Sequence, residues 1–466
     1  MKTTLPVPDL ATDGNVEDAR LFSAYTISAT FWLVLGTAAG LLASFKYSYP
    51  DLMTVSFLAF GRIRPIHTDV VFYGWVSIGL IGLATWIAAR ASGIAIQNRR
   101  ASWTGLAILN LAVLLGTITL AGGMSDGSQE YREWIWPIRV IFLIGGLFAA
   151  QTVFKTVAAR RTHDIYISNW YFIGGFLFLT ILWIVALVPT YQRGLGQVVV
   201  QAYFMHNALG MWFTFLALGT AYYAMPKLLN RPIYSYALGV LGFWTNLVFY
   251  PLVGVHHYEF TPLPWWIQTL AIVFSVGMLV PVWAGSGNFA LTLRGRWAIV
   301  RRSYALPFLV ASIGFYFVGS TQGTMEALRS LQAIWHLTNY TVGHAHATMY
   351  GFISFAIWGG VYALLPRATG RVPNPMVVGV HFWFSFIGVI VYVLTLTVAG
   401  TEQGISWASG NPFINSVTVA APFWLGRAVG GTLMFLGHLL FAYNVWRMTA
   451  APARRAEPTI AAGAPA

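Results

Sequence analysis

The sequence Val342-Gly343-His344-Ala345-His346-Ala347-Thr348 opens a long apolar run that continues from Met349 to Leu365. Two histidines separated by one residue point about 200° apart around a helix with 3.6 residues per turn. Inside a membrane bundle, such a helix can offer one imidazole to each of two metal centres on opposite sides. The alternative is that the histidines only hydrogen-bond neighbouring helices. The remainder of the chain favours the metal centres.

The composition indicates a protein that lies mostly in lipid. Of its 466 residues, 57% are hydrophobic and 9% are charged, against roughly 25% charged residues in soluble proteins. Cysteine is absent, which excludes disulfides, thiolate-bound zinc, cysteine-ligated iron–sulfur clusters and covalent c-type haem. Any metal must therefore be held by His, carboxylate, Tyr or Met. The net charge of +13 indicates membrane topology rather than nucleic-acid binding, because the basic residues gather in alternate loops.

About twelve apolar stretches are long enough to cross a bilayer, for which a helix needs about 20 residues. They lie near residues 22–44, 67–89, 102–121, 136–156, 169–189, 200–225, 235–254, 266–288, 304–320, 340–365, 375–398 and 420–446. A basic loop follows every even-numbered stretch, so the positive-inside rule places both termini in the cytoplasm.

These stretches predict an all-α integral membrane protein. Residues 1–21 are predicted to be a cytoplasmic lead-in, and 22–448 a single membrane domain of about twelve transmembrane helices. The Ala- and Pro-rich residues 449–466 are predicted to be a disordered tail.

Six histidines from four predicted helices fall at one depth of this topology, in the outer third of the bilayer. They are His67, His206, His256, His257, His344 and His346. Ionisable residues inside a membrane are costly and indicate function by default. Their common depth predicts a site with several metals, whereas His163 and His438, nearer the cytoplasmic side, are interpreted as chance.

The spacing of these residues indicates the chemistry. His206 and the pair His256-His257 form a candidate three-nitrogen site for copper, zinc or iron, provided that the pair lies at a fraying helix end. Tyr250 lies on the same face as His257 and roughly 10 Å deeper. Its phenol either supplies a proton and an electron to a bound oxidant or packs between helices. His67 and one histidine of the tenth helix can clamp a six-coordinate haem, and the other can hold a five-coordinate haem facing the copper.

Five motifs stand in order along the chain. They are Gly61-Arg62-Ile63-Arg64-Pro65-Ile66-His67-Thr68, His206-Asn207-Ala208-Leu209-Gly210, Arg231-Pro232-Ile233-Tyr234-Ser235-Tyr236, His256-His257 and Gly343-His344-Ala345-His346. Together they resemble the catalytic subunit I of haem–copper oxidases, and within that superfamily the C-family, or cbb3-type, cytochrome c oxidases. The resemblance runs from roughly residue 20 to 450.

The resemblance implies a role for each candidate ligand. His67 and His346 would bind a low-spin haem b, and His344 would be the proximal ligand of a high-spin haem b. The copper would be held by His206, His256 and His257.

The resemblance extends to the surroundings of these ligands. Tyr250 falls at the family's tyrosine that is covalently joined to the copper ligand matching His206. Glu130 resembles a carboxylate that helps to hold calcium between haem propionates. Arg62, Arg64 and His336 lie at the level where they can pair with those propionates, the alternative being a rim of solvated charge.

The resemblance implies reduction of O2 to water in the inner (plasma) membrane, with electrons from a cytochrome c-type subunit or soluble cytochrome c. Gln322 stands where the C-family usually carries Glu, and Gly239 and Gly242 stand where it offers Ser and His for proton supply from the cytoplasm. These departures leave delivery of protons by that route open.

A second function therefore stays under consideration. The segment His256-His257-Tyr258-Glu259 resembles nitric oxide reductases, which convert two NO to N2O, use iron instead of copper and draw protons from the outer side. Glu259 would then be an outer-side proton donor, or else only a loop carboxylate. A transporter is a third class, which the layer of histidines disfavours because transporters bind ions at broken helices near the midplane.

Overall fold

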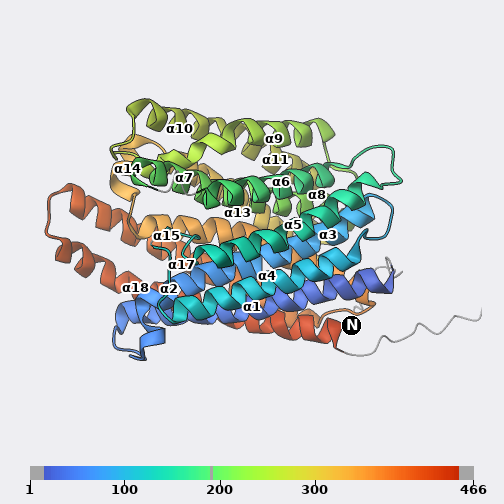
Figure 1. Ribbon diagram of the computed structural model, residues 1–466, viewed down its shortest axis with the longest axis horizontal. Coiled ribbons are helices and arrows are strands. Elements are labelled where there is room, and N and C mark those ends of the chain that lie inside the picture. Colours follow the sequence, from blue (N-terminus) through green and yellow to red (C-terminus); the bar gives the residue numbers. More distant parts are fainter. Residues whose placement is uncertain (1–14, 128, 189–192, 451–466) are drawn as a thin grey trace, which may run out of the picture.

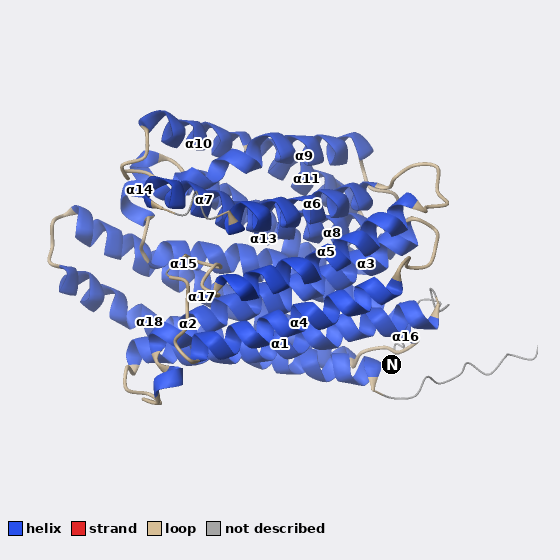
Figure 2. Ribbon diagram, in the orientation of Figure 1, coloured by secondary structure: helices blue, strands red, loops and turns tan. Residues whose placement is uncertain are grey.

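The computed structural model describes residues 15–127, 129–188 and 193–450, and this part of the chain contains helices, turns and loops without strands (Figure 2). The predicted all-α class is confirmed. The bundle axis lies along the horizontal in Figure 1. The predicted disordered tail lies outside the described residues from 451 onward, as does most of the predicted lead-in.

The membrane spans run back and forth along the bundle, and several of them consist of α-helices joined to a 3₁₀-helical or π-helical segment. In order they are α1 (Val16–Ser48), η1 (Ser56–Leu58), α2 (Phe60–Asp69), η2 (Val70–Ser77), α3 (Ile78–Ala91), α4 (Arg99–Ala121), α5 (Trp136–Ala158), α6 (Ile167–Leu187), α7 (Gly194–Asn207), η4 (Ala208–Phe213), α8 (Thr214–Leu229), α9 (Tyr236–Phe249), η5 (Tyr250–Tyr258), α10 (Trp265–Gly277), α11 (Leu279–Leu293), α12 (Trp297–Arg302), α13 (Leu306–Glu326), α14 (Arg329–Trp335), α15 (Asn339–His346), η6 (Ala347–Ser354), α16 (Phe355–Thr369), α17 (Pro375–Ala408) and α18 (Phe413–Thr449).

Eleven helices in the described part of the chain are long and apolar enough to span a membrane. The remaining predicted span, near 304–320, is the 21-residue helix α13. Its last turns contain the polar run Ser320-Thr321-Gln322-Gly323-Thr324, which lowers its hydropathy. Arg90 near the end of α3, Lys227 near the end of α8 and Arg160 after α5 line one cavity at one end of the bundle, called here the basic end.

Three continuous helices form the centre of the bundle. In Phe60–Ala91, Gly194–Leu229 and Asn339–Thr369, 94%, 89% and 89% of the most apolar window is buried, against 33–50% in the other spans. A helix that is apolar on all sides can be buried on all sides. These three helices carry four of the six histidines predicted to bind metals, while His256 and His257 lie in the span Tyr236–Tyr258.

The first helix begins at Val16 rather than near residue 22. The Asn15 side chain caps it by accepting a hydrogen bond from the backbone N–H of Glu17. Asp18 is fully buried and pairs with Arg90 at 2.7 Å and with Arg99 at 2.6 Å. Negative charge in the first turn also favours the helix dipole. Glu17 and Asp18, which the prediction placed in the lead-in, therefore belong to the helix.

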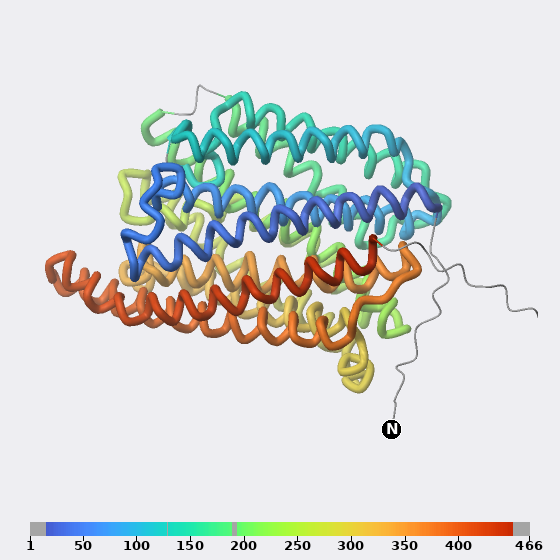
Figure 3. The backbone as a smooth tube through the Cα atoms, turned by 90° about the horizontal axis from the view of Figure 1, so that it is seen from below, coloured from blue at the N-terminus to red at the C-terminus, as the bar shows by residue number. Residues whose placement is uncertain are grey.

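The last two helices extend further than predicted, to Ala408 in α17 and from Phe413 in α18. Figure 1 shows this pair projecting beyond the rest of the bundle, and Figure 3 shows α18 beside α1. The extension of α17 is held by polar contacts: Gln403 accepts hydrogen bonds from Asn339, and Thr401 accepts one from Trp335 at 3.2 Å. These contacts come from α14 and α15, and a hydropathy window cannot register them.

Close packing of α17 on α18 depends on glycine, and this generates a stability prediction. A Cβ added at Gly430 would lie 2.7 Å from the Gly388 carbonyl oxygen, whereas one at Gly431 would meet only a Leu41 methyl at 3.7 Å. We expect Gly430→Ala to destabilise the protein by about 1–3 kcal/mol through overpacking. Gly431→Ala should be neutral or slightly stabilising because alanine favours helix. Thermal unfolding in detergent checks this; equal melting temperatures for the two variants would contradict it.

Candidate metal and haem site

Three histidines converge on one point. His206 is on α7, and His256 and His257 are on η5; one ring nitrogen from each lies within 4.8 Å of the others. Their ring centroids are 4.7, 5.2 and 4.3 Å apart. The predicted fraying end is instead a 3₁₀ helix, whose tighter winding brings both adjacent imidazoles toward His206. A three-nitrogen set with an open position suits copper, zinc or iron.

The orientation of His256 is set by a serine that the sequence analysis did not single out. The Ser275 hydroxyl donates to the Ala271 carbonyl at 2.7 Å, so its oxygen accepts from Nδ1–H of His256, also at 2.7 Å. This leaves Nε2 of His256 for a metal. Gln332 donates to the His256 carbonyl at 2.7 Å and holds the backbone. By contrast, Nδ1 of His206 is buried without a protein partner, as expected of a nitrogen at a metal.

Tyr250 lies beside the three histidines rather than well below them. Its ring centroid is 4.8 Å from that of His206. The phenol packs over Gly210 on η4, where an added Cβ would overlap the ring. The predicted depth of roughly 10 Å is wrong for the phenol, because the absent side chain at Gly210 lets the ring lean toward His206.

The rings of His67 and His346 face each other across a gap. Their centroids are 6.4 Å apart, with an angle of 17° between the planes. Nδ1 of His67 donates to the Gly36 carbonyl at 2.8 Å, and Nδ1 of His346 to the Val342 carbonyl at 2.9 Å. Both Nε2 atoms are therefore left for a metal, and metal–nitrogen bonds of about 2 Å fit this separation. The arrangement suits a haem iron with two axial histidines.

His344 points to the other side of its helix, as its spacing from His346 predicted. Its Nδ1 lies 3.3 Å from Oε1 of Gln322 on α13, and an added Cβ at Gly323 would meet its ring at 3.1 Å. His344 is also an electrostatic neighbour of His206. The tenth predicted helix thus presents one histidine toward His67 and one toward the three-histidine cluster.

Each central helix that carries a candidate ligand changes its winding one to three residues after that ligand. His67 is followed by η2, His206 by η4 and His346 by η6, and all three segments are π-helical. π-Helical turns are rare and occur often at functional sites, because they redirect side chains relative to a regular helix. No sequence signal for these segments was recognised.

Arg427 is the main site residue that the sequence analysis missed. Its guanidinium lies 4.4 Å from the ring centroid of Tyr47 and 5.6 Å from that of Tyr392, and Tyr392 packs on His346 at 4.3 Å. Nε and Nη1 of Arg427 are buried without hydrogen-bond partners. A guanidinium with two buried nitrogens that lack hydrogen bonds, close to two haem-ligand candidates, fits a haem propionate. A lone Arg within an apolar stretch was the available signal.

The predicted propionate partners have other contacts. Arg62 donates to the Ala121 carbonyl at 2.9 Å, and Arg64 pairs with Glu130 at 3.4 Å. His336 follows α14 and is an electrostatic neighbour of His256 and His257. Burial lowers the pKa of the His336 imidazole. The structure thus pairs Arg64 with Glu130 and places His336 in the neighbourhood of the three-histidine cluster.

Gln322, Gly242 and Gly239 are the positions at which the sequence departs from the C-family pattern, and the structure shows what surrounds each of them. Gln322, as described above, contacts His344. An added Cβ at Gly242 would lie 3.3 Å from the Tyr171 hydroxyl, so a phenol from α6 occupies the space beside this glycine. Gly239 has only ordinary contacts around it. Glu259 is buried in the loop after η5, and neither carboxylate oxygen has a hydrogen-bond partner.

Comparisons with known proteins agree with this geometry. Residues 20–433 match the family "Cytochrome C and Quinol oxidase polypeptide I". The chain is 32% identical to the cbb3-type cytochrome c oxidase subunit CcoN1 of Stutzerimonas stutzeri, over 95% of this chain and 97% of that protein. It is 30% identical to cytochrome c oxidase subunit 1 of Rhodobacter capsulatus, over 94% and 87%. A cryo-EM structure of a heme-copper terminal oxidase dimer has the same fold, with a TM-score of 0.82 at 16% identity, covering 95% and 85% of the two chains.

Glu259 generates a prediction about stability and pH. Burial raises the pKa of its carboxyl from 4.5 to about 7, and Arg329 opposes that rise. A carboxyl whose pKa is higher in the folded than in the unfolded protein contributes stability that is fully present below pH 4.5. This contribution is lost as the pH rises through about 7. Between pH 5 and 8, thermal unfolding should therefore show a smaller loss of stability in Glu259→Gln than in the wild type.

Glu17 offers a matched control, because its side chain is exposed and pairs with Arg20 at the surface. Glu17→Gln should follow the wild-type pH dependence. A wild-type pH dependence in Glu259→Gln would show that the Glu259 carboxyl is not protonated in the folded protein at neutral pH.

Proposed function

Because this chain belongs to the cytochrome c and quinol oxidase polypeptide I family, we propose that it reduces O2 to water at a haem–copper centre in the membrane. The observation that carries this proposal is the cluster of His206, His256 and His257 with the Tyr250 phenol beside His206. A nitric oxide reductase needs no such tyrosine. Two relatives that are named cytochrome c oxidases match this chain over 97% and 87% of their own length, which supports oxygen reduction as the function.

The donor atoms support the cofactor assignment. His67 and His346 would hold a low-spin haem b, His344 a high-spin haem b, and the three-histidine cluster a copper ion. These groups supply electron transfer and binding of O2. The protein's own contribution is orientation, because the Nδ1 partners of His67, His346 and His256 leave Nε2 as the metal-binding nitrogen.

Calcium at Glu130 is a finer proposal. Glu130 and Glu133 lie in the same loop at the end opposite the basic end. One oxygen of Glu133 is buried without a partner, and burial raises the pKa of that carboxyl to about 7. A divalent cation would favour the charged form of such carboxylates, since it accepts oxygen ligands.

Tyr250 would provide a proton and an electron when the O–O bond breaks. The phenol is partly buried, with its ring against Gly210 and beside His206. Reprotonation requires a polar route, and the family's usual Ser and His positions are here Gly239 and Gly242. The Tyr171 hydroxyl beside Gly242 supplies a polar group from another helix.

Further polar groups would connect the Tyr171 hydroxyl to Tyr250. The hydroxyls of Tyr222 and Tyr316 and Oδ1 of Asn246 are buried without hydrogen-bond partners. Tyr171 and Tyr222 lie face to face with centroids 5.4 Å apart, and Asn246 lies one turn before Tyr250. Buried polar atoms of this kind are usually bridged by water. We therefore assign proton supply for O2 reduction to this line of groups.

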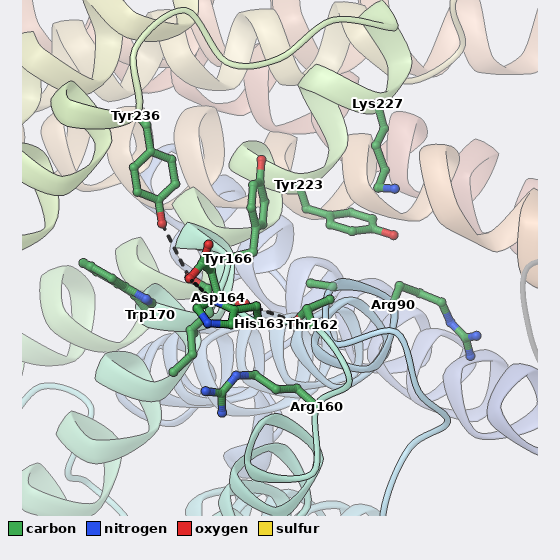
Figure 4. A pocket seen from close by; sticks show the side chains of 12 residues that line it. Arg90, Arg160, Thr162, His163, Asp164, Tyr166, Trp170, Tyr223, Lys227 and Tyr236 are labelled. Atoms are coloured by element: carbon green, nitrogen blue, oxygen red, sulfur yellow. Dashed lines mark hydrogen bonds and ion pairs between the residues drawn. The ribbon is translucent and has the colours of Figure 1, made fainter.

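The line begins at an open cavity of about 1170 Å³ at the basic end (Figure 4). Tyr166 lines the cavity and donates to the Tyr222 carbonyl at 2.8 Å. The Tyr236 hydroxyl on the opposite wall is directed toward the Ile165 carbonyl. Water in this cavity would reach the first phenols of the line.

The orientation and the electron donor complete the proposal. Basic loops face the cytoplasm in membrane proteins, so the basic end would lie in the cytoplasm with both termini. The chain has no Cys to carry its own c haem. Electrons would therefore come from a cytochrome c-type subunit or soluble cytochrome c, and reach the low-spin haem first.

Metal content and turnover test the function directly. The purified complex should contain one copper for each two b-type haem irons in this chain, and it should take up O2 rapidly at an electrode. NO added to the same reduced sample is the competing substrate. Fast NO consumption with little O2 uptake, and a third iron instead of copper, would make the protein a nitric oxide reductase.

Tyr250→Phe tests the role of the phenol. We expect O2 reduction to fall by about 10²-fold or more, with haem spectra and copper content unchanged, because the ring remains but its proton is lost. Tyr443→Phe on α18, a partly exposed residue, is the matched control and should keep full activity. Full activity in Tyr250→Phe would reduce Tyr250 to a packing residue.

A further inference from the structure

We propose that a second line of buried side chains carries protons from the basic end to His438, which takes up a proton as the neighbouring low-spin haem is reduced. This line, called the His438 relay, consists of Tyr362, His381, Ser385, Tyr350, His438 and Thr37. The inference rests on the proposed low-spin haem between His67 and His346. It is separate from the line of groups that leads to Tyr250.

The relay begins where α16 turns into α17 at the basic end. Asn374, which is partly exposed, donates its backbone N–H to Oδ1 of Asn444 at 2.9 Å. Nδ2 of Asn444 donates to the Tyr362 hydroxyl at 3.2 Å. The Tyr362 hydroxyl lies 3.0 Å from Nδ1 of His381. Asn444 thus positions Tyr362, whose own hydrogen is directed to His381.

One gap interrupts the line. Nε2 of His381 and the Ser385 hydroxyl are both buried without hydrogen-bond partners. A Cβ added at Gly437 would come within 2.6 Å of the Ser385 oxygen and 3.5 Å of His381, so both groups border the same glycine. A water molecule between two orphaned polar atoms satisfies them. Ser385 in turn is an electrostatic neighbour of Tyr350.

The far end of the relay lies between α1, η6 and α18. The Tyr350 hydroxyl is 3.0 Å from Nε2 of His438, and Nδ1 of His438 is 3.0 Å from the Thr37 hydroxyl oxygen. Thr37 donates its hydrogen to the Leu33 carbonyl at 2.6 Å. The Thr37 oxygen therefore accepts from Nδ1–H of His438, and Nε2 of His438 accepts from Tyr350.

The hydrogens of the relay all point in one direction. Tyr362 donates to Nδ1 of His381, which leaves Nε2–H of His381 to donate into the gap. Beyond the gap, Tyr350 donates to His438. A line of donors with one polarity is set to move a proton by successive short transfers. Each imidazole receives a proton at one nitrogen and releases one from the other.

The end point lies next to a proposed haem ligand. Thr37 is adjacent to Gly36, whose carbonyl accepts the hydrogen bond from Nδ1 of His67. His438 also packs near Trp358 and has His67 and His381 as electrostatic neighbours. An electron added nearby attracts a proton strongly, because the local dielectric is low. The relay would thus compensate the charge of haem reduction.

The transfer balances in atoms and charge. One electron from the cytochrome c-type donor would reach the low-spin haem, and the Tyr350 proton would move to Nε2 of His438. Tyr350 would regain a proton through Ser385, the bridging water and His381, and His381 would regain one from Tyr362. Tyr362 is 2% exposed, so the proposal includes water between Tyr362 and the basic end. Packing alone does not account for these residues, because His381 and His438 are 0% and 1% exposed and apolar side chains would occupy a membrane interior at lower cost.

The test measures protons taken up as the low-spin haem is reduced. The purified complex is treated with cyanide to block the O2 site, the low-spin haem is reduced at an electrode, and a pH indicator follows the solution. His438→Gln keeps two hydrogen-bonding groups but not the basic nitrogen. We expect at least a twofold loss of proton uptake with an unchanged low-spin haem spectrum. His163→Gln is the matched control, since His163 is 98% exposed, and should behave as the wild type.

Tyr362→Phe probes the supply to His438 at a distance from the haem. It should slow proton uptake about tenfold without changing its extent, while Tyr443→Phe has no effect. Wild-type uptake in His438→Gln with a normal haem spectrum would overturn the proposal. If His438→Gln lost its haem, a wild-type rate in Tyr362→Phe would overturn it equally. Absence of a low-spin haem from the wild-type protein would instead overturn the proposed function.

Discussion

The fixed orientation of buried imidazoles is the constraint on which this structure depends. Nδ1 of His67 and of His346 is bound to a backbone carbonyl, and Nδ1 of His256 to Ser275. An imidazole held in this way can offer its other nitrogen in one direction only. The helices that carry such rings must be surrounded by protein, because unpaired imidazole nitrogens facing lipid are costly. The three central helices meet that requirement for His67 and His346, and His256 on η5 is itself only 5% exposed.

Local backbone geometry then adjusts each ligand. Regular α-helix gives neighbouring residues divergent directions, yet His256 and His257 both face His206, and the 3₁₀ winding of η5 makes this possible. The π-helical segments after His67, His206 and His346 act similarly on the central helices. Gly210 contributes by lacking a side chain, so that the Tyr250 phenol reaches His206. Departures from regular helix and the candidate ligands thus occur together.

Two polar lines leave the basic end and have different destinations. One passes Tyr171 and Tyr316 toward Tyr250, and the other ends at His438 beside the His67 ligand. The replacement of polar family residues by Gly239 and Gly242 therefore does not leave the route to Tyr250 apolar, since Tyr171 occupies the space at Gly242. Each line combines hydrogen bonds or close contacts with buried atoms that need water. Chemistry with protons and electrons in lipid requires such lines because bulk water is absent.

Hydropathy and residue spacing alone determined the membrane helices, the common depth of the six histidines and the opposite directions of His344 and His346, since all of these follow from local periodicity. The helix ends at Val16 and Ala408 were missed because tertiary hydrogen bonds and ion pairs extend those helices. Only the tertiary structure decided the place of Arg427 beside the haem-ligand candidates. It also placed His438, which the sequence analysis attributed to chance, within hydrogen-bond distance of Thr37 and Tyr350. Contacts between residues hundreds of positions apart leave no periodic signal, so they are visible only after folding.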